Sequence, residues 1–206
     1  MMLRRLSRRT VLGAMSALTL LPGLAMATPA TDFVGTFGAE LTKILSSPEP
    51  LQKKQQEILP LLKKNVDIEA IGRYCLGRYW RVATPSQRER YLKLFDQVLL
   101  YAITMQVGNY QNVSLKITGN VPSPAGEKVD ILISRPKQPD VTMTVVVEGP
   151  PSRVIDLYGE GASMRLTQRS DYTAYLSRHG DDVEALIKAL EQQVAQNSAR
   201  LAKGQP

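Results

Sequence analysis

The chain has 206 residues, enough for one ordinary domain, and its composition of 43% hydrophobic and 22% charged residues is that of a globular protein. A single cysteine excludes an internal disulfide and a multi-cysteine zinc site, and a single histidine excludes a histidine-rich metal cluster. The composition therefore argues against most metal-dependent and hydrolytic chemistry, and we expect neither a metal nor a cofactor.

Residues 1–27 have the pattern of a signal peptide for export. Four arginines between residues 4 and 9 precede an apolar stretch over residues 11–24, and Ala25-Met26-Ala27 has the small residues of a cleavage site. The two adjacent arginines before Thr10 also resemble a twin-arginine export signal. The apolar stretch is shorter than the roughly 20 residues that span a bilayer. We therefore expect an exported protein whose mature chain begins near Thr28.

Removal of this signal peptide changes the charge of the protein. It takes away four basic residues and no acidic one, so that 26 basic residues become 22 against 19 acidic ones, and the net charge falls from +7 to +3. The remaining chain has no basic run with interleaved aromatic side chains of the kind that binds single-stranded nucleic acid. We expect no nucleic-acid partner.

Apolar residues at helical spacing predict three helices in the first part of the mature chain. The first covers residues 31–47 and the second residues 51–64, where Pro60 is expected to kink or end the helix. A short helix follows Asp67, which is a suitable N-cap residue.

The strongest local signal is a capping box. Thr84-Pro85-Ser86-Gln87 combines an N-cap threonine, a proline at the first helical position and a glutamine three residues on, and it opens a helix that runs to about Val107. From Val98 this helix is apolar nearly all round. A helix of this kind must be covered on every side, and ten residues cannot cross a bilayer. The cover is therefore protein, a ligand or both.

After Asn112 the hydrophobic period changes from that of a helix to that of a strand. Alternating apolar residues and a fourth short run predict four strands, joined by links rich in proline and glycine, over residues 113–118, 129–133, 141–147 and 153–158. Four strands with short links predict an antiparallel meander, one face of which needs a cover of helices.

Two more helices complete the expected fold. One covers residues 167–179, the other begins at Asp181, and a tail over residues 199–206 is expected to fray. We therefore predict an α+β fold, a single domain over residues 28–198 in which helices embrace one face of a curved, antiparallel sheet of four or slightly more strands.

The chain shows no motif for nucleophilic, phosphate or dinucleotide chemistry. His179 precedes a glycine at a helix end, where a capping contact is its ordinary role. Cys75 lies among apolar residues and has no neighbouring base, so we expect a buried structural thiol. Asp130 and Asp156 lie on strands, and either would have a raised pKa if it faced an apolar pocket.

Two blocks of the chain carry a family resemblance. The first is Leu76-Gly77-Arg78-Tyr79-Trp80-Arg81, followed by Gln87, Tyr91, Phe95 and Tyr101. The second is Val154-Ile155-Asp156, followed by Gly159-Glu160-Gly161-Ala162-Ser163 and Arg169. In order and position they resemble the signature of the MlaC family, also called the toluene-tolerance family, over roughly residues 33–195. Two positions depart from it, because the usual tryptophan is replaced around Ser152 and Ala162 stands where valine is more common.

The resemblance implies a phospholipid shuttle. Members of this family hold acyl chains in a cavity between sheet and helices, with the head group toward solvent. They exchange lipid with an outer-membrane lipoprotein complex and with the substrate-binding ring of an inner-membrane ABC transporter, in a system that maintains outer-membrane lipid asymmetry. Their sheet is likened to the nuclear-transport-factor-2 type. We accordingly expect a monomeric, periplasmic, non-enzymatic carrier of phospholipid.

A cavity of this kind needs two apolar walls. On the long helix we expect the lipid-binding residues Leu99, Tyr101, Ala102, Ile103 and Met105. On the sheet we expect Leu115, Ile117, Val129, Ile131, Ile133, Met143, Val145 and Val147. An acyl chain of about 15 methylenes gains on the order of 12 kcal/mol when it leaves water for such a site. The same residues would equally fill an ordinary packed core.

Two other functions fit the pattern. A ketosteroid-isomerase-like enzyme needs an aspartate and a tyrosine within hydrogen-bond reach in an apolar pocket, and the available pairing is Asp156 with Tyr101 or Tyr110. An adaptor without cargo would instead have a tightly packed interior and an exposed apolar patch.

The start of the long helix is rich in arginine. These side chains form either a basic rim that guides docking to acidic surfaces or an ordinary solvated helix face: Arg78, Arg81, Arg88 and Arg90.

Overall fold

The computed structural model describes residues 27–110 and 112–202. The predicted signal peptide, apart from Ala27, and the last four residues of the predicted tail lie outside the described residues. None of the helices formed by the described residues combines the length and the apolar composition that crossing a bilayer requires.

The described chain forms seven α-helices, a short 3-10 helix and one sheet. The helices are α1 (Pro29–Leu45), α2 (Leu51–Asn65), α3 (Ile68–Leu76), α4 (Tyr79–Val82), α5 (Pro85–Met105), η1 (Val107–Asn109), α6 (Met164–Arg178) and α7 (Val183–Ala202). The strands are β1 (Ser114–Ser123), β2 (Gly126–Arg135), β3 (Gln138–Glu148), β4 (Arg153–Gly159) and β5 (Ala162–Ser163). All neighbouring strands pair antiparallel in the order β1-β2-β3-β4-β5, which confirms the predicted α+β fold with a curved meander and adds a fifth, two-residue strand.

The helix boundaries follow from local capping chemistry. The predicted capping box is present, since the Gln87 amide donates to Thr84 Oγ1 at 3.2 Å and the Thr84 amide donates to Gln87 Oε1 at 3.0 Å. Asp67 caps α3 by accepting from the Ala70 amide at 2.9 Å. Ser163 caps α6 in the same way, which starts this helix three residues before the predicted position.

The C-terminal ends of two helices bear on the predicted boundaries, and the predicted range 51–64 of the second helix is matched to within one residue. Helix α2 does not end at Pro60 but continues to Asn65, because the residues after the proline bury apolar side chains, Leu61 and Leu62, against the core. Helix α7 extends to Ala202, so the first four residues of the tail predicted from residue 199 are helical.

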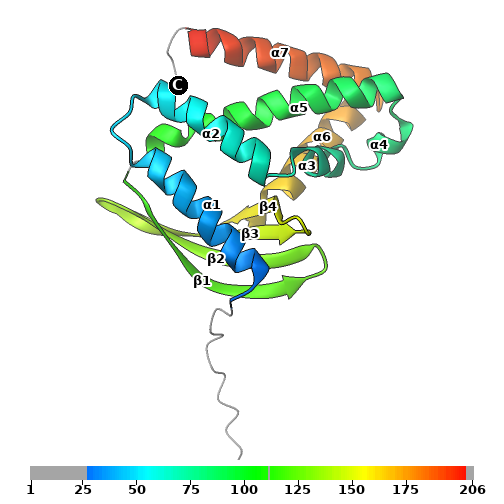
Figure 1. The fold of residues 1–206 in the computed structure, drawn as a ribbon. Coiled ribbons are helices and arrows are strands. Elements are labelled where there is room, and N and C mark those ends of the chain that lie inside the picture. Colours follow the sequence, from blue (N-terminus) through cyan, green and yellow to red (C-terminus); the bar gives the residue numbers. More distant parts are fainter. Residues whose placement is uncertain (1–26, 111, 203–206) are drawn as a thin grey trace, which may run out of the picture.

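The strand register places three rows of apolar side chains on one face of the sheet. The rows are Leu115, Ile133 and Val141; Ile117, Ile131 and Met143; and Val129, Val145 and Leu157. Helix α1 crosses this inner face (Figure 1). It approaches β1 closely through glycines, since a β-carbon on Gly38 would lie 3.0 Å from Leu115 Cδ1. Strand β1 is an edge strand, and a bulge interrupts its register between Ile117 and Gly119.

A second helical layer lies beyond α1 and α2. In it α5 packs along α7, and these two helices form the side of the molecule that is farthest from the sheet (Figure 1). Tyr91 and Phe95 of α5 meet Tyr172 of α6 edge to face, with ring centroids 6.2 and 6.5 Å apart. The Tyr91 hydroxyl donates to the Gly72 carbonyl at 2.8 Å, and burial raises the pKa of Tyr91 far above its usual range.

The contact between α3 and α5 requires a glycine at position 72. A β-carbon there would lie 2.9 Å from Phe95 Cδ1 and 3.0 Å from Leu92 Cδ2, and Phe95 is held among other buried rings. We expect Gly72→Ala to lower the free energy of unfolding by about 1–3 kcal/mol, measured by urea titration. The control is Gly35→Ala in α1, where the nearest atom is 3.8 Å away, and which we expect to be neutral or stabilising by up to about 1 kcal/mol. Equal stability of the two variants would contradict this packing.

Candidate functional site

The inner face of the sheet is covered unequally along its strands. At one end Val129, Val145 and Val147 are buried. Toward the other end Ile133 and Met143 are only half-buried, although they lie on central strands and on the face that the helices cover. Gly159, which pairs with Met143, adds no side chain there. Water therefore contacts part of the inner face of the sheet at this end.

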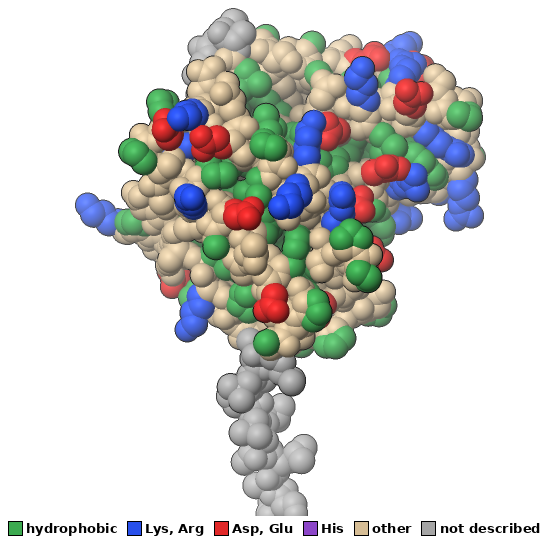
Figure 2. Space-filling model, in the orientation of Figure 1, with side chains coloured by type: hydrophobic (Ala, Val, Ile, Leu, Met, Phe, Trp, Pro, Cys, Tyr) green, Lys and Arg blue, Asp and Glu red, His purple; other side chains and the backbone are tan. Residues whose placement is uncertain are grey.

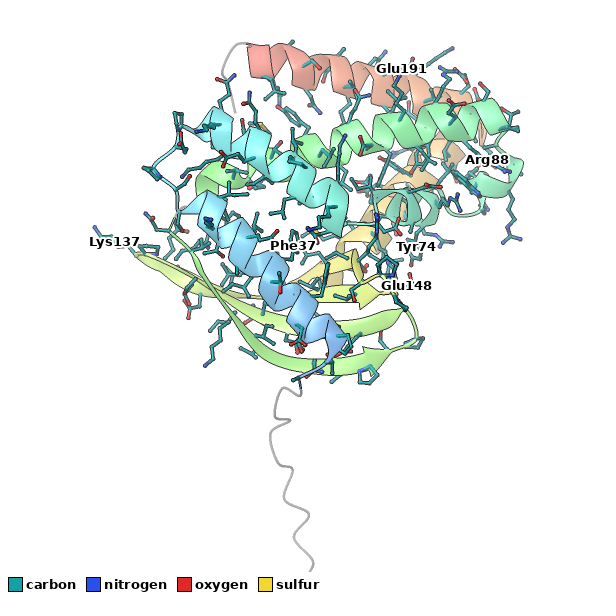
Figure 3. All side chains as sticks on the ribbon, viewed as in Figure 1. Phe37, Tyr74, Arg88, Lys137, Glu148 and Glu191 are labelled. Atoms are coloured by element: carbon teal, nitrogen blue, oxygen red, sulfur yellow. The ribbon has the colours of Figure 1, made fainter. Side chains whose placement is uncertain are left out.

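Half-buried apolar side chains of α1 and of the C-terminal half of α5 also pack against the buried core, and α1 does so across the sheet. Phe33 and Phe37 of α1 stack with ring centroids 6.1 Å apart, and Figure 3 marks Phe37 on the part of α1 that packs against the core. We call one set of half-buried apolar side chains that pack against this core, from α1, α5, Tyr110 and the sheet, the half-buried apolar cluster: Phe33, Phe37, Leu41, Ile44, Leu99, Ile103, Tyr110, Leu115, Ile117, Ile133 and Met143. Apolar side chains that are only partly buried can bind an apolar ligand, which removes their remaining surface from water.

The predicted lipid-binding residues fall into three groups. All those on the strands share the inner face, and four of them are buried in the packed core: Val129, Ile131, Val145 and Val147. The others on the strands are half-buried: Leu115, Ile117, Ile133 and Met143. On α5 four are half-buried: Leu99, Tyr101, Ile103 and Met105.

The remaining predicted residue, Ala102, is exposed. The expectation that it faces the interior is wrong, because the apolar end of α5 is not covered on every side and Ala102 lies on the open side. The sequence prediction also missed the contribution of α1. Its signal was present as the helical stripe that includes Phe33, Phe37, Leu41 and Ile44, which predicts an inward face but not which part of the interior that face meets.

Two buried polar atoms in this part of the molecule have no hydrogen-bond partner among the described residues. They are the Tyr101 hydroxyl oxygen on α5 and the Arg135 Nε at the end of β2. A buried donor without a partner is unfavourable by about 1–3 kcal/mol, so such groups require an explanation.

A pocket with a volume of about 530 Å³ lies where α5 ends. It is lined by Gln106, Gly108, Asn109, Tyr110, Asn112, Arg135, Pro136 and Gln138. Tyr110 belongs both to this pocket and to the half-buried apolar cluster, and Arg135 follows Ile133 along β2. The polar pocket and the apolar cluster therefore adjoin each other.

Asp156 has a structural role in this fold. It is 3% exposed and accepts hydrogen bonds from Ser163 Oγ at 2.6 Å and from the Leu157 and Arg165 amides at 2.8 and 3.1 Å. It also pairs with the Arg165 guanidinium at 3.3 Å. These partners fix the start of α6. Neither tyrosine of the isomerase hypothesis is among them, so the required pairing with Asp156 is not formed.

The other candidate groups are also explained by structure. His179 ends α6, where its Nδ1 lies 2.7 Å from the Tyr175 carbonyl oxygen, as predicted for a capping contact. Asp130 accepts a hydrogen bond from the Thr144 hydroxyl at 2.6 Å. The described residues hold no group of three histidine, cysteine, aspartate or glutamate side chains arranged for a metal ion.

Three of the four arginines near the start of α5 bind other parts of the chain. Arg90 donates to Glu184 and Glu191 of α7, both at 2.8 Å, and these hydrogen bonds raise its pKa. Arg88 donates to the Trp80 carbonyl at 2.8 Å, and Arg78 donates to the Tyr79 hydroxyl at 2.7 Å. Basic and acidic side chains are intermixed over the face shown in Figure 2. These contacts within the chain favour an ordinary helix face, whose arginines stabilise the fold, over a basic rim that guides docking.

The fold and the site together define a small α+β binding domain with a sheltered apolar interior. The model of the family described as MlaC protein matches residues 37–192, which is well over half of the chain, and the chain belongs to this family. The family resemblance seen in the two sequence blocks is thereby confirmed.

Individual relatives are similar over most of their length. The intermembrane phospholipid transport system binding protein MlaC of Haemophilus influenzae is 22% identical over 183 residues, which cover 85% of this chain and 83% of that protein. The structure of a phospholipid-binding protein from Ralstonia solanacearum, in complex with a phospholipid, has a TM-score of 0.72 at 20% identity. It covers 82% of this chain and 98% of that one. This similarity confirms the fold.

The buried thiol gives a prediction for the packed part of the interior. Cys75 is fully buried, its Sγ donates to the Arg165 carbonyl at 3.6 Å, and burial raises its pKa from 9.0 to about 12. We expect Cys75 to resist a disulfide thiol reagent at pH 8 in the native protein and to react at once in denaturant. Reaction of the native protein at the rate of a free thiol would contradict this.

The raised pKa of Cys75 also predicts how the stability of the protein changes with pH. Because the folded-state pKa is the higher one, the protonated thiol contributes its full stabilisation below about pH 9. This contribution is lost as the pH rises toward 12, and urea titrations across that range measure the loss.

Proposed function

We propose that this protein is a periplasmic phospholipid-binding shuttle and not an enzyme. In this proposal the acyl chains lie against the half-buried apolar cluster and the head group lies toward solvent. The observation that carries the proposal is the partial exposure of Ile133 and Met143 on central strands, on a face that the helices cover. The relatives named for phospholipid binding and for intermembrane transport support the choice of ligand.

The side chains of the half-buried apolar cluster suit a flexible chain. Leucine, isoleucine and methionine offer apolar surface without directional contacts, and aromatic rings from α1 close one side. Each buried methylene of a lipid gains about 0.8 kcal/mol, so the apolar contacts supply most of the affinity. No arginine cluster or metal is then needed to retain the lipid.

The exchange partners in this proposal are an inner-membrane ABC transporter with a substrate-binding ring and an outer-membrane lipoprotein complex. The pattern of an export signal at residues 1–27 supports a periplasmic location between these two membranes. A monomer suits the role, since each copy then carries its own lipid between them.

An adaptor without cargo is the remaining alternative, and lipid extraction separates it from a carrier. We expect organic extraction of the purified protein to release phospholipid in stoichiometric amount, quantified by mass spectrometry. We further expect Ile103→Gln to lower the retained lipid about tenfold, because an amide replaces an apolar contact.

The matched control for this experiment is Ala102→Gln on the exposed side of the same helix, which we expect to retain lipid as the wild type does. A wild-type extract without phospholipid would favour the adaptor and reject the carrier. An equal loss in the two variants would show that Ile103 does not contact the lipid.

The hydroxyl of Tyr101 gives a second test. It is buried without a protein partner, and we assign it to an ester oxygen of the bound lipid. We expect Tyr101→Phe to leave the free energy of unfolding of delipidated protein unchanged or raised by up to about 1 kcal/mol, since the change removes an unpaired group. The same variant is expected to weaken lipid retention about twofold to tenfold. Reduced stability with unchanged retention would instead indicate a protein partner for the hydroxyl.

A further inference from the structure

The pocket at the end of α5 is built differently from the apolar cluster beside it. Its walls are the last residues of α5, the short helix η1 and the β2–β3 hairpin, which turns tightly because Arg135 pairs directly with Gln138. The lining residues include side-chain amides at Gln106, Asn109 and Gln138, one arginine and no acidic residue. The pocket therefore presents a positive charge and side-chain amides, among which Asn109 Nδ2 donates to Gln106 Oε1 at 2.9 Å.

Arg135 supplies that charge, and its guanidinium lacks a hydrogen-bond acceptor for Nε and a carboxylate partner among the described residues. Its Nε is buried without a hydrogen-bond partner, and none of the described carboxylates lies within ion-pair distance of its guanidinium. The guanidinium lies 5.3 Å from the centre of the Tyr110 ring, which holds its plane in place. In contrast, Arg90 and Arg165 each pair with a carboxylate. The unpaired donor at Arg135 calls for an anionic acceptor from outside the chain.

We propose that this pocket binds the phosphate of a phospholipid and that Arg135 is the residue that recognises it. The inference rests on the proposed function, because it requires acyl chains in the adjoining half-buried apolar cluster. A guanidinium presents parallel N–H donors that match two oxygens of a phosphate. The amides of Gln106 and Gln138 are placed in the same pocket to donate further hydrogen bonds.

The position of the pocket suits this ligand. Ile133 belongs to the apolar cluster, and Arg135 lies two residues further along the same strand. Tyr110 contributes its ring to both places. In this proposal the acyl chains contact Ile133, and the phosphate of the same lipid lies next to Arg135. A volume of about 530 Å³ is sufficient for a small polar head group.

The experiment compares two lipids that differ in the phosphate. Delipidated wild type, Arg135→Gln, Arg135→Lys and Lys137→Gln are titrated with dioleoylphosphatidylglycerol and with dioleoylglycerol, both in a non-ionic detergent, and bound lipid is counted by native mass spectrometry. We expect Arg135→Gln to weaken binding of the phospholipid about tenfold and to leave binding of the diacylglycerol unchanged. Arg135→Lys is expected to be intermediate, because it keeps the charge but loses the paired donors.

Lys137→Gln is the matched control, since Lys137 is an exposed cation on the same hairpin that does not line the pocket. It is expected to bind both lipids as the wild type does. Urea titration of each variant verifies that the fold is intact. An equal loss of both lipids in Arg135→Gln, or no loss of either, overturns the inference while the carrier function stands. If the wild type binds neither lipid, the proposed function fails and the inference fails with it.

A final arm separates the lipid phosphate from free phosphate. Inorganic phosphate is titrated against the same proteins by isothermal calorimetry, and we expect no saturable binding at millimolar concentration. Saturable binding that Arg135→Gln abolishes, with binding of the phospholipid unchanged, would assign the pocket to free phosphate and overturn the inference.

Discussion

The structure depends on removing one face of the sheet from water. Three cross-strand rows of apolar side chains lie on that face, and the helices exist in this arrangement because those rows must be covered. Val129 and Val145 are buried by this cover, whereas Ile133 and Met143 are only half-buried. The hydrophobic effect stabilises the buried end of this face. At the half-buried end the same effect favours the binding of an apolar ligand.

Polar interactions stabilise the packed end of the structure. Asp156, with Ser163 and Arg165, fixes the start of α6 against β4, and Arg90 joins α5 to α7. These contacts belong to the packed end and hold the outer helices in place. Away from this packed end, the buried Tyr101 hydroxyl and Arg135 Nε have no hydrogen-bond partner among the described residues.

Local sequence signals predicted most of the fold. A period of two fixes which strand residues share a face, so the inner-face assignment of all the predicted strand residues is confirmed. The capping box likewise located the start of α5. The degree of burial along a strand depends on where distant helices lie, which no local pattern encodes. Ala102 was wrongly predicted to face the interior for a related reason. In a stretch that is apolar nearly all round, the hydrophobic pattern does not show which side of the helix faces solvent.

The bulge in β1 bears on how the protein behaves at high concentration. In this open sheet β5 is only two residues long, so β1 provides the long unpaired edge. The bulge after Ile117 and the proline at position 122 interrupt the regular row of backbone donors and acceptors on that strand, and the exposed Lys116 adds a charge that opposes pairing. A second copy of the chain therefore cannot easily add a strand at this edge, which protects the protein against edge-to-edge aggregation.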